Sequence, residues 1–288
     1  MHKNLTRLND ATWRSPTEPG YGTFIGAFGG WTCAAGVLAA TELVNTAGPV
    51  ADDQRRDPLA LTINFIGPVR EGFIVVEPVI AASTKSTTHV SLTAWHETPS
   101  HQRAPLPSAT MSLVFAKRRA GDRVDVTPMP EAGPAAPAAP AESVPRARFA
   151  NDKVSWPAQY DQRMVLGTPF QPNPGMRTLT WTRNADMAAL TFARLAAMAD
   201  ASLPRIFFHY GALSPISTVT MTVQFHCDAD ELAAVGNDFV LIEATANAAR
   251  HGHFDQHVRL FSKAGQLLAS STQLVWFDVQ SSSPSGSA

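Results

Sequence analysis

The same order of apolar segments occurs twice in this 288-residue chain, on either side of a stretch rich in proline and alanine. In the first half, the helical run GGWTCAAGVLAATELV precedes four strand-like segments, and in the second half DMAALTFARLAAMADASLPRIFF precedes four more. The strand assignments rest on alternation of apolar and polar residues and on β-branched content, and turns are marked by glycine, proline and Lys-Ala-Gly. The period is far above the roughly 20–50 residues of stacked repeats, so it indicates a duplicated domain.

Aligning the halves places residues 61–65 on 221–225 and residues 112–114 on 273–275. The stretch between the halves, PMPEAGPAAPAAPAESVP at 128–145, offers few anchors for a core, so we expect it to cross the surface as a semi-rigid linker. The domain prediction is therefore an N-terminal domain at 1–127, a linker at 128–150, a C-terminal domain at 151–278 and a disordered tail at 279–288.

The composition fits a protein with substantial cores, because hydrophobic residues make up 44% and charged residues 16%. The net charge of -1 gives no basic footprint for nucleic acid. Cys33 and Cys227 are too few for a disulfide framework. The first residues contain no apolar signal region, and the uncharged stretch at 20–41 is interrupted by glycines, which favours a buried helix over a membrane span. We expect a soluble, cytoplasmic protein; a homo-oligomer is compatible with the sequence.

One long apolar helix followed by antiparallel strands is an α+β pattern, in which the sheet wraps a helix too apolar to be exposed. The segments FGGWTCAAGVLAA, LTINFIGPVREGFIVVEP, MADASLP, STVTMTVQFH and ASSTQ together resemble the type II acyl-CoA thioesterases, double-hotdog enzymes related to bacterial thioesterase II. The resemblance implies a tandem hotdog fold, with a long helix wrapped by an antiparallel sheet in each half. It also implies hydrolysis of acyl-CoA to a free carboxylic acid and CoA, without cofactor or metal.

In the family that the chain resembles, an Asp, a Thr and a Gln of the C-terminal half hold the hydrolytic water. The resemblance assigns these roles to Asp200, which follows LAAMA, to Thr218, which opens the strand ending in Phe-His, and to Gln273 of ASSTQ. Thr220 and Thr222 are alternatives to Thr218. The helix of the N-terminal half shows no acid, and two glycines stand there instead.

The residue types suit thioester hydrolysis on physical grounds. A carboxylate in apolar surroundings has a raised pKa and can act as a general base, and neutral Thr and Gln can orient a water. A backbone N–H at Gly29 or Gly30 could receive the developing oxyanion at a helix N-terminus. The competing interpretation makes Asp200 a helix-end cap and Thr218 an ordinary strand residue, and leaves the two glycines to permit tight packing.

Other functions are less well supported by the sequence. His251, His253, Asp255 and His257 alternate along one face of a strand, but a solvated polar face explains them more simply than a metal site. The main rival is a non-catalytic acyl-CoA or lipid-binding double hotdog. An enoyl-CoA hydratase or dehydratase is less favoured, because it would need an Asp and a His closer together than Asp200 and His209. We expect a tunnel of apolar side chains to take the acyl group.

Overall fold

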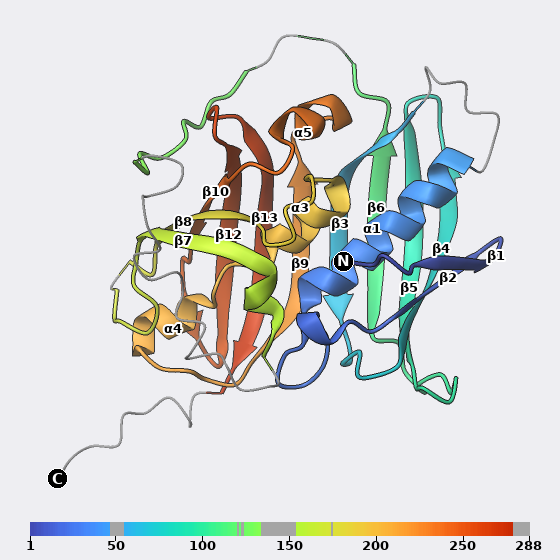
Figure 1. The fold of residues 1–288 in the computed structure, drawn as a ribbon, viewed down its shortest axis with the longest axis horizontal. Helices are drawn as coiled ribbons and strands as arrows, with labels where there is room; N and C mark the ends of the chain where they lie inside the picture. Colours follow the sequence, from blue (N-terminus) through green and yellow to red (C-terminus); the bar gives the residue numbers. More distant parts are fainter. Residues whose placement is uncertain (47–54, 120, 122–123, 134–153, 174, 279–288) are drawn as a thin grey trace.

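The computed structural model describes residues 1–46, 55–119, 121, 124–133, 154–173 and 175–278. Helices cover one face of a single antiparallel sheet in both halves (Figure 1). The N-terminal half consists of β1 (Thr6–Asn9), β2 (Thr12–Pro16), the 3-10 turn η1 (Pro19–Tyr21), α1 (Gly29–Thr46), β3 (Asp57–Phe65), β4 (Phe73–Ser83), β5 (Thr87–Glu97) and β6 (Ala109–Ala116). The C-terminal half consists of η3 (Trp156–Gln159), β7 (Tyr160–Leu166), β8 (Thr178–Asn184), α3 (Phe192–Ala199), α4 (Arg205–Tyr210), β9 (Ile216–Phe225), α5 (Ala229–Val235), β10 (Val240–Thr245), β11 (Ala249–Arg250), β12 (His253–Ser262) and β13 (Leu267–Phe277).

The strand order shows that the two halves repeat one topology and share one sheet. It reads β1-β2-β4-β5-β6-β3-β9-β13-β12-β10-β8-β7, with β11 paired to β12. The halves meet where β3 pairs with β9, and Thr62 lies opposite Thr222 with their hydroxyl oxygens 3.2 Å apart. The predicted alignment of 61–65 with 221–225 makes these two threonines counterparts, so the pseudo-two-fold axis passes between them. This pairing removes an exposed edge from each half, and the tandem hotdog fold is confirmed.

The alignment of the last strands is wrong by one residue. Ser112 pairs with Thr62, and Thr272 pairs with Thr222, so Ser112 corresponds to Thr272. The counterpart of Gln273 is therefore Leu113. A shift of one residue exchanges the two faces of a strand, which explains why Ser112 is exposed whereas Gln273 is buried.

Two strand pairs at the outer ends of the sheet were not predicted from the sequence. β1 and β2 extend the N-terminal half beyond β4, and β7 and β8 extend the C-terminal half beyond β10. Their sequences contain many polar residues, as in TWRSP and TLTWTRN, and this obscures the apolar alternation. They give each half two further strands outside its four-stranded core.

The long helix predicted for the C-terminal half is interrupted. Thr191 caps the start of α3 by accepting a hydrogen bond from the Arg194 N–H, and α3 ends at Ala199. The next helix, α4, begins only after Pro204, which has no backbone N–H and disfavours helical geometry at the preceding residue. Asp200 lies in the gap between the two helices, where groups from other elements can contact its side chain.

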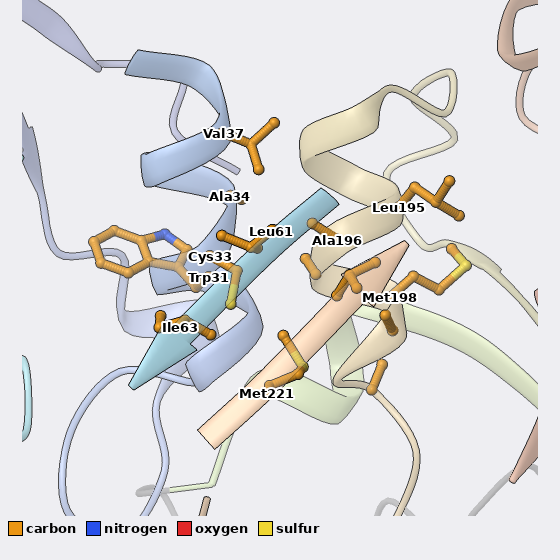
Figure 2. Packing of buried hydrophobic residues seen from close by; sticks show 14 of the residues in the cluster. Trp31, Cys33, Ala34, Val37, Leu61, Ile63, Leu195, Ala196, Met198 and Met221 are labelled. Atoms are coloured by element: carbon orange, nitrogen blue, oxygen red, sulfur yellow. The ribbon is translucent and has the colours of Figure 1, made fainter. Parts of the chain in front are cut away.

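The main core lies between the helices and the inner face of the sheet. α1 packs against α3, and both cover the junction of β3 and β9, where Trp31, Leu61, Ile63 and Met221 are buried (Figure 2). Cys33 and Cys227 are buried free thiols. No helix in the described ranges is both long enough and apolar enough to span a membrane.

A second, smaller apolar cluster lies on the outer face of the C-terminal half. The Trp181 indole donates a hydrogen bond to the Ala132 carbonyl, at 3.4 Å, and Met129 packs against the same cluster. The prediction that residues 128–145 avoid both cores is therefore wrong for Met129 and Ala132, because outward-facing Trp181 and Phe261 require a cover. Residues 134–150 of the linker and the predicted tail at 279–288 lie outside the described residues.

Candidate active site

Asp200 lies where the end of α3 meets the beginning of α1 from the other half. A β-carbon at Gly29 would lie 2.7 Å from Oδ2 of Asp200, and one at Gly30 would lie 2.6 Å from the carbonyl oxygen of Ala197. Both distances are too short for any residue other than glycine. The two glycines therefore permit the approach of the helices, and they place the N-terminus of α1 against the carboxylate.

Two hydrogen bonds hold the carboxylate of Asp200. Gln273 Nε2 donates to Asp200 Oδ1 at 3.0 Å, and the same amide nitrogen lies 3.4 Å from the carbonyl oxygen of Ala199. The backbone N–H of Gly30 also donates to this carboxylate. The residues that contact Asp200 thus come from α1 in one half and β13 in the other.

Burial raises the pKa of Asp200 to about 7, although the hydrogen bonds from Gly30 and Gln273 lower it. The positive end of the α1 dipole adds to the stabilisation of the ionised form. A carboxylate with a pKa near neutrality can both accept and return a proton under physiological conditions. Burial also raises the pKa of Cys33, and the charge of Asp200 acts in the same direction, so this thiol stays protonated.

Thr218 faces the same side of the sheet as Gln273 because of a bulge in β9. Thr220 pairs with Leu274 and Thr218 with Val275, so Val219 is left over between them. A bulge of this kind re-aims the side chains that follow it. Val275 is buried on the inner face, as is Gln273, and Thr218 lies beside Val275.

The two alternative threonines are turned away from Asp200. The Thr220 hydroxyl donates to the carbonyl oxygen of Ile63 at 3.0 Å, and Thr222 contacts Thr62 at the junction of the halves. Within the described ranges, the Thr218 hydroxyl makes no hydrogen bond to Asp200. The structure thus joins Asp200, Gln273 and the two glycines directly, and places Thr218 on the same face at the next strand.

The described residues of the N-terminal half form no equivalent of this arrangement. Leu113 occupies the position that corresponds to Gln273. Gly29 and Gly30 do not mark a second, silent site, because they contribute to the site of Asp200 itself. One polar site is therefore built from both halves.

Two buried polar residues near the site were missed by the sequence reasoning. The guanidinium of Arg205 donates through Nε to Gln256 Oε1 at 3.2 Å, and Gln256 lies directly opposite Gln273 in the β12–β13 pair. Gln256 could have been found from the sequence, because its amide lies on the apolar face of its strand with Phe254 and Val258. A buried amide needs hydrogen-bond partners, which would have indicated a second polar residue nearby.

The histidine-rich strand face forms a polar network. Asp255 accepts hydrogen bonds from the backbone N–H groups of Asn247 and Ala248, and its carboxylate lies 2.7 Å from His257 Nε2. Among the described residues, no group of three or more His, Cys, Asp or Glu side chains is arranged to hold a metal ion.

Comparison with protein families matched residues 17–116 to the acyl-CoA thioesterase N-terminal domain and residues 130–277 to the acyl-CoA thioesterase C-terminal domain. Among solved structures, a conserved protein of unknown function with a hotdog fold from Alicyclobacillus acidocaldarius is 29% identical with a TM-score of 0.79, over 96% of this chain and 97% of that chain. A putative thioesterase from Novosphingobium aromaticivorans is 17% identical with a TM-score of 0.77, over 96% and 100% of the two chains. An acyl-CoA thioesterase II from Mycobacterium marinum is 17% identical with a TM-score of 0.66, over 99% and 97%. No curated protein matches the sequence.

Proposed function

The chain belongs to the acyl-CoA thioesterase family, and we propose that it hydrolyses acyl-CoA thioesters to free carboxylic acids and CoA with Asp200 as the general base. The observation that carries this proposal is the buried carboxylate of Asp200, held by the Gln273 amide at the N-terminus of α1. A group with a pKa near neutrality in such a place is suited to proton transfer.

The proposed reaction begins with a water held by Asp200, Gln273 and Thr218. Gln273 donates to Asp200 through Nε2, and its amide oxygen can accept a hydrogen from the water. Asp200 removes a proton as the water oxygen attacks the thioester carbon. The resulting tetrahedral intermediate carries a negative oxygen that needs a hydrogen-bond donor. The backbone N–H of Gly30 is already bonded to Asp200, so the neighbouring backbone N–H of Gly29 is the donor that can stabilise this oxygen.

Collapse of the intermediate breaks the carbon–sulfur bond and completes the proton balance. The electron pair leaves with sulfur, and the protonated Asp200 returns its proton to the CoA thiolate. The products are a carboxylic acid and free CoA, and Asp200 is regenerated as a carboxylate. No redox step and no further reactant are required.

The test is a screen of short, medium, long and aromatic acyl-CoA substrates for release of free thiol. The proposal predicts thiol release from at least one of these classes, and its loss in Asp200→Asn. Binding of acyl-CoA to folded protein without thiol release would instead identify a non-catalytic acyl-CoA-binding protein. Hydration of an enoyl-CoA without thiol release would identify a hydratase.

A further inference from the structure

The chain loses its regular helical hydrogen bonds at Asp200. The Asp200 N–H donates to the carbonyl oxygen of Ala197 at 3.1 Å, and the next N–H donates to the carbonyl oxygen of Met198 at 3.0 Å. Each of these bonds reaches back three residues, as in a 3-10 turn, and not four, as in an α-helix. Residues 201–204 then belong to no helix or strand. Groups outside α3 must therefore fix the direction in which Asp200 points.

The break in the helix and a set of buried polar residues occur in the same half of the molecule. α1 continues for 18 residues, whereas α3 ends after eight. Buried Gln256 in the C-terminal half corresponds to Val90 in the N-terminal half, because Gln256 pairs with Gln273 and Val90 pairs with Leu113. Each buried polar group must recover its lost hydration. The half that contains Asp200 therefore has a use for polar groups that the apolar half lacks.

Gln162 of β7 holds the residue that follows Asp200. Its Nε2 donates to the carbonyl oxygen of Ala201 at 2.9 Å, and both residues are buried. The other amide atom, Oε1, is buried and makes no hydrogen bond within the described residues. Since β7 is the outermost strand of the C-terminal half, this bond ties the chain beside Asp200 to a part of the sheet far from β13, which carries Gln273.

Arg205 holds the same segment from its other end. Its guanidinium donates to the carbonyl oxygen of Leu203, and the whole side chain is buried. The remaining bonds anchor the guanidinium to the sheet, through Thr178 Oγ1 on β8 at 2.8 Å, the carbonyl oxygen of Ala244 on β10 at 3.3 Å, Gln256 Oε1 on β12 at 3.2 Å and the carbonyl oxygen of Met176 at 2.9 Å. A guanidinium presents its N–H groups in a fixed plane. It therefore places Leu203 at a defined position relative to three strands.

The geometry of the candidate active site requires such a hold. The Asp200 carboxylate accepts from the Gln273 amide and from the Gly30 N–H at the same time. It also lies so close to Gly29 that a β-carbon there would be 2.7 Å from Oδ2. A displacement of about 1 Å between reacting groups lowers a rate by about 100-fold. An eight-residue helix that ends beside Asp200 does not by itself fix the carboxylate to that accuracy.

We propose that Gln162 and Arg205 are positioning residues, which direct the Asp200 carboxylate toward Gln273 and the N-terminus of α1 by holding residues 201–203 against the sheet. The inference rests on the proposed thioesterase function and adds to it two residues that do not touch the substrate. Loss of either hold lets the carboxylate move away from its two donors. Turnover then falls, and the pKa of Asp200 rises, because the hydrogen bonds that lower it are weakened.

The main test is Gln162→Met, which keeps the length of the side chain and removes the donor to Ala201. The substrate is the acyl-CoA that the substrate screen shows to be hydrolysed fastest. We expect kcat for thiol release to fall by about 10–100-fold, because the base is displaced from the water. KM should change by less than about twofold, because the lost bond acts on the base and not on the substrate.

The pH dependence distinguishes positioning from a general loss of stability. In Gln162→Met the low-pH limb of the pH–rate profile should move to higher pH, as the pKa of Asp200 rises. Cys33 on α1 and Tyr160 on β7 also interact electrostatically with Asp200, but burial raises the pKa of both groups, so they stay protonated at neutral pH and below. Burial lowers the pKa of Arg205 to about 9, so its charge does not change in this range.

The matched control is Thr182→Val. Thr182 lies opposite Gln162 in the β7–β8 pair, and its hydroxyl is buried and makes no hydrogen bond in the described part of the chain. Valine has nearly the same shape, and the hydrogen bond from Gln162 to Ala201 stays in place. We therefore expect wild-type kcat and a wild-type pH–rate profile in this variant.

Arg205→Lys is a second variant at the other end of the segment. Lysine keeps the charge, but its single ammonium group cannot bond all the acceptors of the guanidinium. It should lower kcat in the same way as Gln162→Met. The loss in the double variant should be smaller than the product of the two single losses, because both residues act on one segment. Losses that multiply fully would contradict a shared role.

Each outcome separates this inference from the proposed function. An unchanged kcat in folded Gln162→Met, or an equal loss of kcat in Thr182→Val, would overturn the positioning role and leave the thioesterase function intact. If the wild-type protein releases thiol from no acyl-CoA, the proposed function fails, and NMR titration of the Asp200 carboxyl group tests the positioning by itself. A higher pKa in Gln162→Met than in the wild-type protein and Thr182→Val would support it. Equal pKa values in the three proteins would overturn it.

Discussion

Asp200 combines two opposing influences within one side chain. Burial penalises its charge, and the hydrogen bonds from Gly30 and Gln273 recover only part of that penalty, so the pKa stays near 7. A carboxylate that served only to cap the N-terminus of α1 would gain stability from its charge. Ionised Asp200 instead lowers the stability of the folded protein, which is typical of a functional carboxylate.

Replacement of Asp200 by Asn therefore separates function from stability. Asp200→Asn keeps the size of the side chain and removes the proton acceptor, so thiol release should fall by about 10²–10⁴-fold. Stability at pH 8 should rise, by roughly 4 kcal/mol at most, because the buried charge is gone. A purely capping role predicts the opposite, a loss of about 0.5–2 kcal/mol with turnover near normal. Melting temperature and turnover are measured on one preparation; undiminished turnover in the folded variant would eliminate the mechanism.

The pH dependence of the reaction should report the same group. Since the base must be ionised, kcat/KM should fall about tenfold per pH unit below the pKa of Asp200 near 7. The stability effect has the opposite sign: the folded pKa lies above the unfolded value, so the contribution of Asp200 to stability declines as pH rises from about 4 to 7. A pH–rate profile from pH 5 to 9 tests this, with Asp200→Asn as the control that should lack the limb. A profile that is flat down to pH 5 would contradict the assignment.

At the level of elements, the bulge in β9 decides which threonine can serve the site. Strict alternation places Thr218, Thr220 and Thr222 on one face, and only the extra residue Val219 turns Thr218 to the side of Gln273. The family resemblance selected Thr218 from the sequence, and the strand geometry gives an independent reason for the same choice.

Two conservative replacements on β9 test the assignment of Thr218 to the site. Thr218→Val should lower turnover by about tenfold, because one neutral hydrogen bond to the water is lost. Thr222→Val makes the same change on the other face of β9, where the hydroxyl contacts Thr62, and should leave turnover unchanged. Thiol release is compared at equal concentrations of folded protein. Equal losses in the two variants would remove Thr218 from the proposed mechanism.

The sequence predicts what depends on local pattern and misses what depends on register and packing. The duplicated order of elements and the apolar helix before each set of strands are visible in the apolar pattern. Pro204 is the only sequence signal for the break after Ala199. The apolar helical pattern on both sides of the break led to the prediction of one continuous helix. The one-residue error that paired Ser112 with Gln273 arose because the two strands share little residue identity, and only the hydrogen-bonded neighbours Thr62 and Thr222 fix their register.

In the whole molecule, the described residues of the two halves form one candidate site of this kind, and both halves contribute to it. The carboxylate of Asp200 and the amide of Gln273 come from the C-terminal half, whereas the glycines that accommodate them begin the helix of the N-terminal half. Leu113 makes the N-terminal half apolar at the position where the C-terminal half carries Gln273. One copy has thus become a partner that completes the other.

Because both halves contribute to the candidate site, the behaviour of a cleaved protein can be predicted. A protease site inserted within residues 134–150 should yield two fragments that remain associated, because β3 and β9 are hydrogen-bonded across the junction and α1 packs against α3. The associated fragments should retain thiol release, since Gly29 and Gly30 still meet Asp200. Separation of the fragments in denaturant and refolding of the C-terminal fragment alone should abolish activity, and addition of the N-terminal fragment should restore it. Size-exclusion chromatography and thiol release follow the two steps. Fragments that elute separately under native conditions, or a C-terminal fragment active by itself, would show that the halves do not form one site.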